Sequence, residues 1–256
     1  ENMIAHAQPG VVLLDFQNEV ESQGLFYPPD PASLKWCTLG GNVAENAGGP
    51  RALKYGVTKD YVLGLRAVLP HGEIIETGKQ TVKGVAGYDL TSLLCGSEGT
   101  LAVLTGITFK LIPNSPAVQT AIVVFASAQD AARGVAEVFK NGVVPRTLEY
   151  LDKASIAAVA QHGAPYRFPV EAAAALIVET DGLDEEDALR HLMRALDAMQ
   201  RVQPLDTLLA KDERQRRDIW QTRRLLSEAT RKIKKRKISE DVVVPRSKIP
   251  EMVARI

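Results

Sequence analysis

The chain has 256 residues, of which 45% are hydrophobic and 24% charged, a composition typical of soluble globular protein that forms one large domain or two ordinary ones. It excludes a disordered chain, a collagen-like chain and a disulfide scaffold. Lys plus Arg and Asp plus Glu both number 31, and the resulting net charge of zero argues against a generally basic nucleic-acid-binding protein.

The first part of the chain combines many glycines with short apolar runs. Its predicted strands are residues 11–14, 61–69, 73–76 and 101–112. A turn signal at 70–73 joins the second and third of these strands in a hairpin. The segment 113–116, Pro-Asn-Ser-Pro, then breaks the chain, so we expect one domain over 1–116 and another over 117–256.

The second part alternates strands and helices, which indicates helices stacked on a sheet. The predicted strands are 120–125, 147–151, 172–180, 205–209 and 242–244. Helices are predicted over 127–140, 152–161, 184–201 and 212–235, with another starting at 245. Ser127, Asp152 and Asp184 are the expected N-caps of three of them, because their short polar side chains accept hydrogen bonds from free backbone N–H groups.

Cys37 and Cys95 are the two cysteines of the chain. So few thiols in a chain of this length suggest a reducing compartment. They are able to form one bridge, but nothing in their spacing requires it. We therefore interpret both as small buried hydrophobic residues.

The region most informative about chemistry runs from residue 28 to 101 and contains paired glycines. In TLGGN (38–42) and NAGG (46–49), glycines allow positive φ and remove side chains, so backbone N–H groups can approach a ligand closely. Two interpretations remain open: a surface for a flat or phosphorylated ligand, and a glycine-rich connection between strands. The spacing matches neither GxxxxGK[ST] nor GxGxxG, so a P-loop and a Rossmann turn are not supported.

Five motifs in a fixed order resemble the FAD-binding domain of the vanillyl-alcohol oxidase (PCMH-type) flavoprotein family, in its D-2-hydroxy-acid dehydrogenase branch, which includes glycolate oxidase and D-lactate dehydrogenase. They are PPDPAS (28–33), TLGGN with NAGG, KYG (54–56), GYDL (87–90) and GSEGTL (96–101). PRTLEYLD and SEDVVVPRSKIPE resemble the cap domain of that family. The resemblance implies an α+β fold, with a partial FAD-binding domain followed by a cap domain whose antiparallel sheet is covered by helices.

The resemblance assigns cofactor contacts residue by residue. The loop that leads to the flavin contains Pro28, Asp30 and Pro31. The wall near the isoalloxazine and ribityl chain contains Thr38, Gly40, Gly41, Asn42, Ala47, Gly48 and Gly49. A second cofactor-lining loop contains Gly96, Ser97, Glu98, Gly99 and Thr100, and the adenine end is lined by Ile107. Tyr88 and Asp89 have either a structural role or contact the flavin. Glu98 either binds a ribose hydroxyl or caps glycine N–H groups.

Arg223, in WQTRRLLS, resembles the arginine with which the family grips a substrate carboxylate, and Ser227 lies one turn further on the same helix face. Arg224 is the alternative in the next register. A third interpretation is that these are ordinary solvated arginines. Trp220 is expected to pack in the core.

The resemblance also implies parts that do not match. The pyrophosphate-binding loop of the family precedes the strand expected at 11–14, and its metal site and catalytic histidine follow a segment like VVVPRSKIPE. The four histidines are scattered, without ligand spacing: His6, His71, His162 and His191. We therefore assign no metal ligand and no catalytic residue, and expect an internal portion of a longer flavoenzyme that does not turn over alone. FAD is the implied cofactor, and a divalent metal is expected only in a complete family member.

The run 231–237, RKIKKRK, is sharply basic and lies near a helix C-terminus. It is interpreted as a solvated helix end or as a landing patch for an acidic partner or anionic lipid. Nucleic acid is disfavoured because no aromatic residue is interleaved.

The function implied by the resemblance is FAD-dependent oxidation of a D-2-hydroxy acid, glycolate or D-lactate, with electrons passing to an iron–sulfur subunit or another acceptor. The implied location is the cytoplasm, with peripheral contact to the inner membrane as the alternative. Two other hypotheses stay open: a structural or assembly subunit or fragment without activity, and a different flavin activity on the same fold. Visible flavin absorbance separates the first hypothesis from the second.

Overall fold

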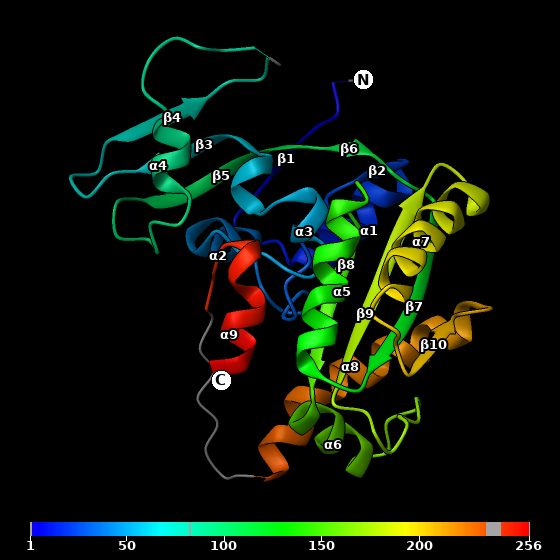
Figure 1. Cartoon of the computed structure of the whole chain (residues 1–256). Coiled ribbons are helices and arrows are strands. Elements are labelled where there is room, and N and C mark those ends of the chain that lie inside the picture. Colours follow the sequence, from blue (N-terminus) through cyan, green and yellow to red (C-terminus); the bar gives the residue numbers. More distant parts are fainter. Residues whose placement is uncertain (1, 82, 234–241, 256) are drawn as a thin grey trace. The chain divides into compact units, whose positions relative to one another are not determined.

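The computed structural model describes residues 2–81, 83–233 and 242–255. These form two compact units, residues 1–115 and 116–256 (Figure 1). None of the described helices combines the length and the hydrophobicity that a membrane crossing requires.

Unit 1 is built on a four-stranded antiparallel sheet with the order β1-β5-β3-β4. The strands of the unit are β1 (Ile4–Ala7), β2 (Leu25–Phe26), β3 (Val62–Val68), β4 (Ile74–Gly78), β5 (Val103–Lys110) and β6 (Ile112–Pro113). Its helices are α1 (Leu13–Ser22), α2 (Leu39–Glu45), α3 (Ala52–Tyr55) and α4 (Leu90–Leu94), with a 3₁₀ turn at Thr58–Tyr61. The β3–β4 hairpin expected from the turn at 70–73 is confirmed.

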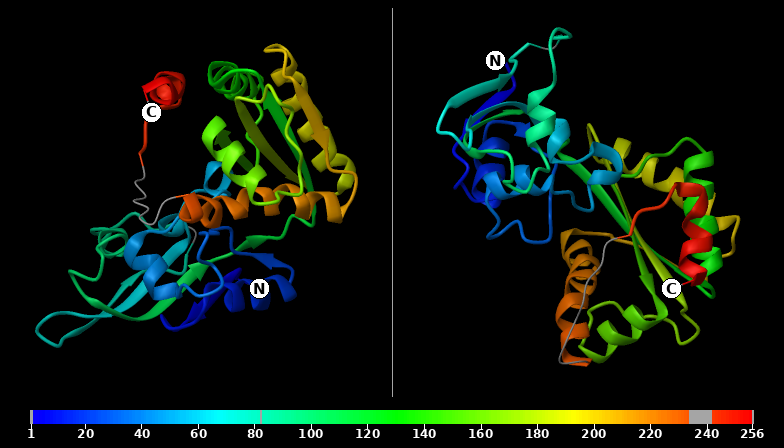
Figure 2. Two further views of the ribbon diagram at one scale, coloured as in Figure 1. Left: turned by 90° about the horizontal axis from the view of Figure 1, so that it is seen from below. Right: turned by 90° about the vertical axis from the view of Figure 1, so that its left-hand side faces the viewer.

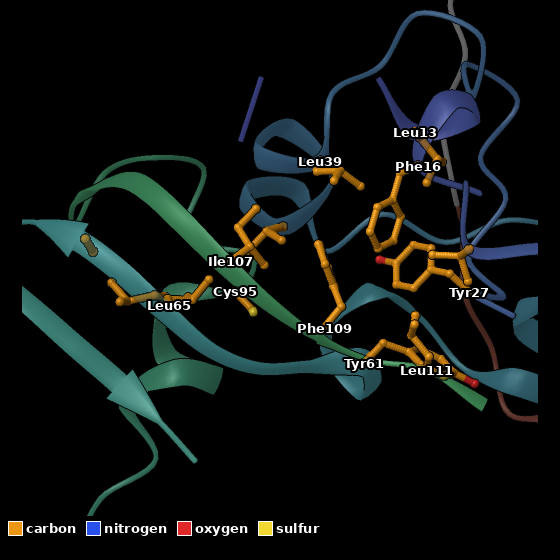
Figure 3. Close-up of a cluster of buried hydrophobic side chains, with 14 of the residues drawn as sticks. Leu13, Phe16, Tyr27, Leu39, Tyr61, Leu65, Cys95, Ile107, Phe109 and Leu111 are labelled. Carbon is orange, nitrogen blue, oxygen red and sulfur yellow. The ribbon is translucent and has the colours of Figure 1, made fainter. Parts of the chain in front are cut away.

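The core of unit 1 joins α1, α2 and α4 to the inner face of this sheet (Figure 3). Phe16, Tyr27 and Phe109 form a ring cluster at its centre, with centroids 5.0–5.3 Å apart. Each buried side chain of this size contributes about 1.5–3 kcal/mol to folding relative to an exposed one. The core therefore fixes where α2 and the segment after α4 lie, and these carry most of the expected cofactor residues.

Unit 2 is a four-stranded antiparallel sheet, β10-β7-β9-β8, with helices on both faces. The strands are β7 (Ala117–Phe125), β8 (Thr147–Asp152), β9 (Ala174–Gly182) and β10 (Asp206–Leu209). The helices are α5 (Ala128–Lys140), α6 (Lys153–Gln161), α7 (Glu185–Gln200), α8 (Glu213–Ile233) and α9 (Ile249–Arg255), preceded by a 3₁₀ turn at Arg246–Lys248. The expected antiparallel sheet covered by helices is confirmed.

The two faces of this sheet have separate cores because β9 is apolar on both sides. Leu176 and Val178 pack with α5 and α7, whereas Ala175 and Ile177 pack with α6 and α8. Figure 2 shows the sheet lying between these two pairs of helices. The face of the sheet beneath α8 also carries the polar residues described below.

The N-caps expected from sequence are confirmed for three helices of unit 2. The side chains of Ser127, Asp152 and Asp184 accept hydrogen bonds from the backbone N–H three residues on, at 3.0, 2.7 and 2.8 Å. Each cap satisfies a backbone donor that would otherwise lack a partner at the start of the helix.

The strand expected at residues 11–14 is wrong, because helix α1 begins at Leu13. Val12 is extended and forms an isolated bridge with Thr38, and the helix follows directly. The buried positions Leu13, Phe16 and Val20 have helical spacing, which the short β-branched run before them obscured.

The strand expected at residues 242–244 is also wrong. These residues form no strand, and Val243 is 95% exposed. A β-branched run needs a neighbouring strand to satisfy its backbone, and none of the described strands pairs with it. The basic run begins in the last turn of α8, where Lys232 pairs with Glu228 at 3.0 Å, and its residues 234–237 lie outside the described part of the chain.

Both cysteines are free thiols; Cys95 is buried in the core of unit 1 and Cys37 is half-buried against it. Burial raises the pKa of Cys95 to about 11 from 9.0. At pH 8 we expect a thiol reagent to modify Cys37 first and Cys95 only after unfolding, because the thiolate is the reactive form. Ellman titration with and without denaturant measures this, and rapid native modification of both thiols would contradict it.

Candidate functional site

The TLGGN motif forms the start of helix α2 rather than a loop. Thr38 is the N-cap, and its hydroxyl accepts a hydrogen bond from Gly41 N at 3.3 Å. None of the four paired glycines has positive φ. Positive φ, which glycine allows, is therefore not what these positions require, and the segment is not a simple connection between strands.

The paired glycines differ in how closely other parts of the chain approach them. A Cβ on Gly40 would lie 2.6 Å from Pro9 Cβ, and one on Gly49 would clash with the backbone carbonyl of Asp30. A Cβ on Gly48 would lie 3.3 Å from Val57. Gly41 is exposed, and a Cβ there would meet only the Thr38 hydroxyl, at 3.4 Å. Packing within the chain thus accounts for Gly40 and Gly49, whereas Gly41 borders open space.

The left-handed position in this region belongs to Asn46, which ends α2 with φ 52°. Its side-chain Oδ1 accepts a hydrogen bond from Lys59 N at 2.9 Å. The following carbonyl, of Ala47, accepts from Thr58 N at 3.0 Å and from the Thr58 hydroxyl at 2.7 Å. Sequence reasoning missed this role, although asparagine at a helix end is a recognised left-handed cap.

The GSEGT segment docks on α2. Gly96 N donates to Val43 O, and Glu98 N donates to Ala44 O, both at 2.9 Å. Gly96, Glu98 and Gly99 all have positive φ. For Glu98 this conformation is strained, and such strain in a non-glycine residue is concentrated at functional sites. The structure thus brings together two motifs that are about 50 residues apart in the chain.

The side chains of this segment settle one open alternative. Glu98 is exposed, and no described residue donates a hydrogen bond to its carboxylate. It therefore does not cap the glycine N–H groups in this structure. Thr100 is likewise exposed, and its hydroxyl donates to Ser97 O at 2.6 Å, which closes the turn.

The PPDPAS loop is held from inside the unit. Pro28 is buried, and Gln17 Nε2 donates to Tyr27 O and Pro29 O at 3.0 and 2.9 Å. Asp30 pairs with Arg51, at 3.3 Å from Nε, and accepts from Arg51 N at 3.1 Å. The Asp30 carboxylate thus joins this loop to the segment after NAGG, which is a structural role that does not require a ligand.

Ile107 has its side chain in the core, where it is 3% exposed and packs near Leu65 and Cys95 (Figure 3). Its backbone lies in the central strand β5, where Ile107 is paired with Ala7 of β1 and with Leu65 of β3. Ile107 also lines a groove of about 560 Å³ on the sheet of unit 1, together with residues of β1, β3 and β4.

The GYDL motif divides between two environments. Asp89 is the N-cap of α4 and accepts from Ser92 N at 2.9 Å, and hydrogen bonding to Ser92 lowers the pKa of its carboxyl group. Tyr88 is 99% exposed. The structural interpretation therefore holds for Asp89, and the Tyr88 ring has no packing role within the described residues.

Two observations test whether these residues fit FAD. Gly41, Gly96 and Gly99 are exposed, and added Cβ atoms would meet little, which leaves backbone accessible to a flat ligand. Asn42 is 3% exposed, and its Nδ2 has no hydrogen-bond partner among the described residues. An unmet buried donor is costly unless something accepts from it, and FAD is rich in acceptors. The residues present thus fit this cofactor.

The expected substrate anchor lies on α8 of unit 2. Arg223 is half-buried, and its Nε donates to Glu149 Oε2 on β8 at 2.7 Å. Ser227, one turn on, is exposed, as is Arg224. Glu149 was not expected as a functional residue, and its pairing with a residue 74 positions away leaves no local signal in the sequence.

Beneath α8 the sheet carries a buried charged cluster. Arg146 lies 3.4 Å from Glu179 and 3.6 Å from Asp181. Glu179 Oε2 also accepts from Thr120 Oγ1 at 2.9 Å and from Trp220 Nε1 at 2.6 Å. Trp220 packs against the core as expected, and this hydrogen bond attaches α8 to β9.

Within the described residues, no group of three or more His, Cys, Asp and Glu side chains is arranged to hold a metal ion. His6 contacts Thr108 and His71 contacts Glu73, each at 3.0 Å. His162 contacts the carbonyl of Ala158, also at 3.0 Å.

Two sequence families match the chain. Residues 1–78 match a FAD binding domain, and residues 114–256 match the C-terminal domain of FAD linked oxidases. The second match alone covers more than half of the chain. The chain belongs to the FAD-linked oxidases.

The names of curated relatives of this chain are consistent with the FAD-linked oxidases. A glycolate oxidase subunit GlcD from Bacillus subtilis is 41% identical over 100% of the chain and 54% of its own length. A D-lactate dehydrogenase from Anaerostipes hadrus is 36% identical over 99% and 54%, and a D-2-hydroxyglutarate dehydrogenase from Stutzerimonas stutzeri is 31% identical over 88% and 48%. The chain thus spans about half the length of these relatives.

A solved structure of alkyldihydroxyacetonephosphate synthase superposes with a TM-score of 0.69, at 20% identity, over 91% of this chain and 43% of that one. At this identity the likeness supports the fold alone. The resemblance to PCMH-type flavoproteins inferred from five short motifs is confirmed.

Proposed function

We propose that the protein is a FAD-dependent oxidoreductase that oxidises a small D-2-hydroxy acid, glycolate or D-lactate. The relatives named glycolate oxidase subunit and D-lactate dehydrogenase support this substrate class. The electrons would pass to an iron–sulfur subunit or another acceptor, in the cytoplasm or at the inner membrane. The substrate, the acceptor and the location go beyond what family membership specifies, and the substrate assignment rests on the site residues.

The observation that carries the proposal is the guanidinium of Arg223. The Arg223 side chain is 37% exposed, and Nε is the guanidinium nitrogen that has a partner among the described residues. Both Nη groups therefore remain for a ligand, and a planar guanidinium fork suits a carboxylate. Ser227, four residues on, would add a hydroxyl on the same helix face.

The chain's own contribution is binding and orientation. Bound FAD would supply the acceptor for the α-hydrogen of the hydroxy acid, taken as hydride. Gly41, Asn42 and the Gly96–Thr100 turn would hold it, with backbone and the unmet Asn42 amide. Arg223 would fix the carboxylate, so that the reacting carbon is presented in one orientation.

Gly41→Val in the FAD-loaded holoenzyme tests the cofactor part. We expect FAD binding to weaken by about 1–3 kcal/mol, the usual effect of inserting methyl groups into a fitted surface. Thermal stability should change little, because an added Cβ meets only the Thr38 hydroxyl at 3.4 Å. The measurement is visible flavin absorbance per protein, with FAD titration into the apoprotein.

Two glycine variants serve as controls. Gly10→Val adds the same side chain where no atom lies within 4 Å of a Cβ, and it should retain FAD. Gly40→Ala should lower the melting temperature instead, because its Cβ would lie 2.6 Å from Pro9. Stoichiometric FAD in Gly41→Val would reject the assignment of this surface to the flavin.

A further inference from the structure

We propose that Glu149 is a positioning residue, which holds the Arg223 guanidinium so that its two Nη groups are presented to the substrate carboxylate. The proposal rests on the proposed function, in which Arg223 is the carboxylate anchor. It adds to the site a residue on a different element, β8, that does not contact the substrate itself.

The contact between these residues is short and sheltered. Arg223 Nε donates to Glu149 Oε2 at 2.7 Å, and the two side chains are 37% and 20% exposed. A charge-assisted hydrogen bond at this distance is among the stronger side-chain contacts. Binding through Nε leaves the outer edge of the guanidinium for a ligand, whereas binding through the Nη pair would have occupied it.

The position of Glu149 is itself fixed by the sheet. In the register of β8 and β9, Thr147 pairs with Glu179 and Glu149 pairs with Ile177. Glu149 and Glu179 are two positions apart in this register, so they project from the same face. Glu179 accepts a hydrogen bond from Trp220, which lies one turn before Arg223 on α8. Two carboxylates on adjacent strands thus hold successive turns of α8 and fix the rotation of the helix.

The consequence for binding is entropic. A free arginine side chain loses rotamer freedom when it grips a ligand, and this loss weakens binding. Glu149 makes the guanidinium ordered before the substrate arrives. Its negative charge acts in the opposite direction, because it repels the carboxylate of the substrate. Positioning and repulsion predict opposite changes in KM, which makes them separable.

The test is steady-state kinetics of the holoenzyme with D-lactate and glycolate, for Glu149→Ala, Glu149→Asp and Glu149→Gln. Alanine removes the acceptor and aspartate is too short to reach Nε, so both should raise KM by about 3- to 10-fold, the cost of ordering one long side chain. The kcat should change less. Glutamine keeps an oxygen that accepts from Nε, so its KM should remain at the wild-type value or below.

Glu137→Ala is the matched control. Glu137 is 19% exposed, pairs with Arg201 at 3.0 Å and belongs to α5, on the other face of the sheet. It should leave KM unchanged. Melting temperature and FAD content of every variant are measured alongside, and Glu149→Asp, which keeps the charge, provides the test if Glu149→Ala does not fold.

Three results would overturn the proposal or its basis. A lower KM in both Glu149→Ala and Glu149→Gln means that Glu149 competes with the substrate for Arg223. An unchanged KM in Glu149→Ala and Glu149→Asp means that the ion pair is only structural. If Arg223→Ala also leaves KM unchanged, the proposed function fails at its anchor; if Arg223→Ala raises KM while the Glu149 variants do not, only the positioning role is rejected.

Discussion

Replacing Arg223 with alanine is expected to reduce kcat/KM for glycolate or D-lactate roughly 30- to 1000-fold, because a charge-assisted pair with the substrate carboxylate is lost. This corresponds to a loss of about 2–4 kcal/mol of transition-state stabilisation. Most of the effect should appear in KM, since the arginine binds the carboxylate in the ground state as well as in the transition state. Arg223→Lys should recover only part of the loss, because an ammonium group has neither the fork nor the Nε that Glu149 holds.

The neighbouring residue provides the control for this experiment. Arg224→Ala removes the same charge from the adjacent, exposed position on α8 and should leave the kinetics near wild type. The reverse outcome, with Arg224 sensitive and Arg223 silent, would mean that the anchor lies in the alternative register. Flavin absorbance should be unchanged in both variants, which separates substrate binding from cofactor loss.

Replacing Arg146 with alanine is expected to have the largest effect on stability, about 3–5 kcal/mol, because breaking a buried ion pair leaves an uncompensated charge. Arg146 is 6% exposed and lies between Glu179 and Asp181, which are 7% and 2% exposed. Without the guanidinium, two buried carboxylates would lie side by side on one face of β9, two residues apart in the strand. Thermal and denaturant unfolding measure the loss.

A surface arginine of unit 2 calibrates the Arg146 result. Arg201→Ala removes an ion pair to Glu137 in which the arginine side chain is 60% exposed, and it should change stability by less than about 1 kcal/mol. If Arg146→Ala costs no more than Arg201→Ala, the buried cluster is not held by its charges. A double variant of Arg146 and Glu179 should cost less than the sum of the single changes, because the two residues share one interaction.

Local signals in the sequence predict most of unit 2. Ser127, Asp152 and Asp184 cap helices as expected, because a cap depends only on residues within one turn. The apolar run around Leu176 also predicts its strand locally, because the signal lies within the run itself. The local pattern failed at residues 242–244, where a run of valines has no strand beside it.

In the candidate site, the motifs identified the family and the cofactor region, but the tertiary structure decided what each glycine does. The positions of Gly40 and Gly49 have no room for a side chain, because Pro9 and Asp30 lie against them, whereas Gly41 borders open space. The three residues belong to equivalent-looking glycine pairs. Their difference depends on which distant segment the core places beside each one, and a sequence motif does not contain that information.

The sequence by itself therefore determined the family, the alternation of elements in most of unit 2 and the starts of three of its helices, because these depend on residues that are near one another in the chain. Only the tertiary structure joined Arg223 to Glu149 and Arg146 to Glu179 and Asp181. Those contacts depend on the register of β8 against β9 and on the rotation of α8 above them. Register and rotation are set by the packing of the whole core, and a one-residue slip in a strand would turn Glu149 to the opposite face of the sheet.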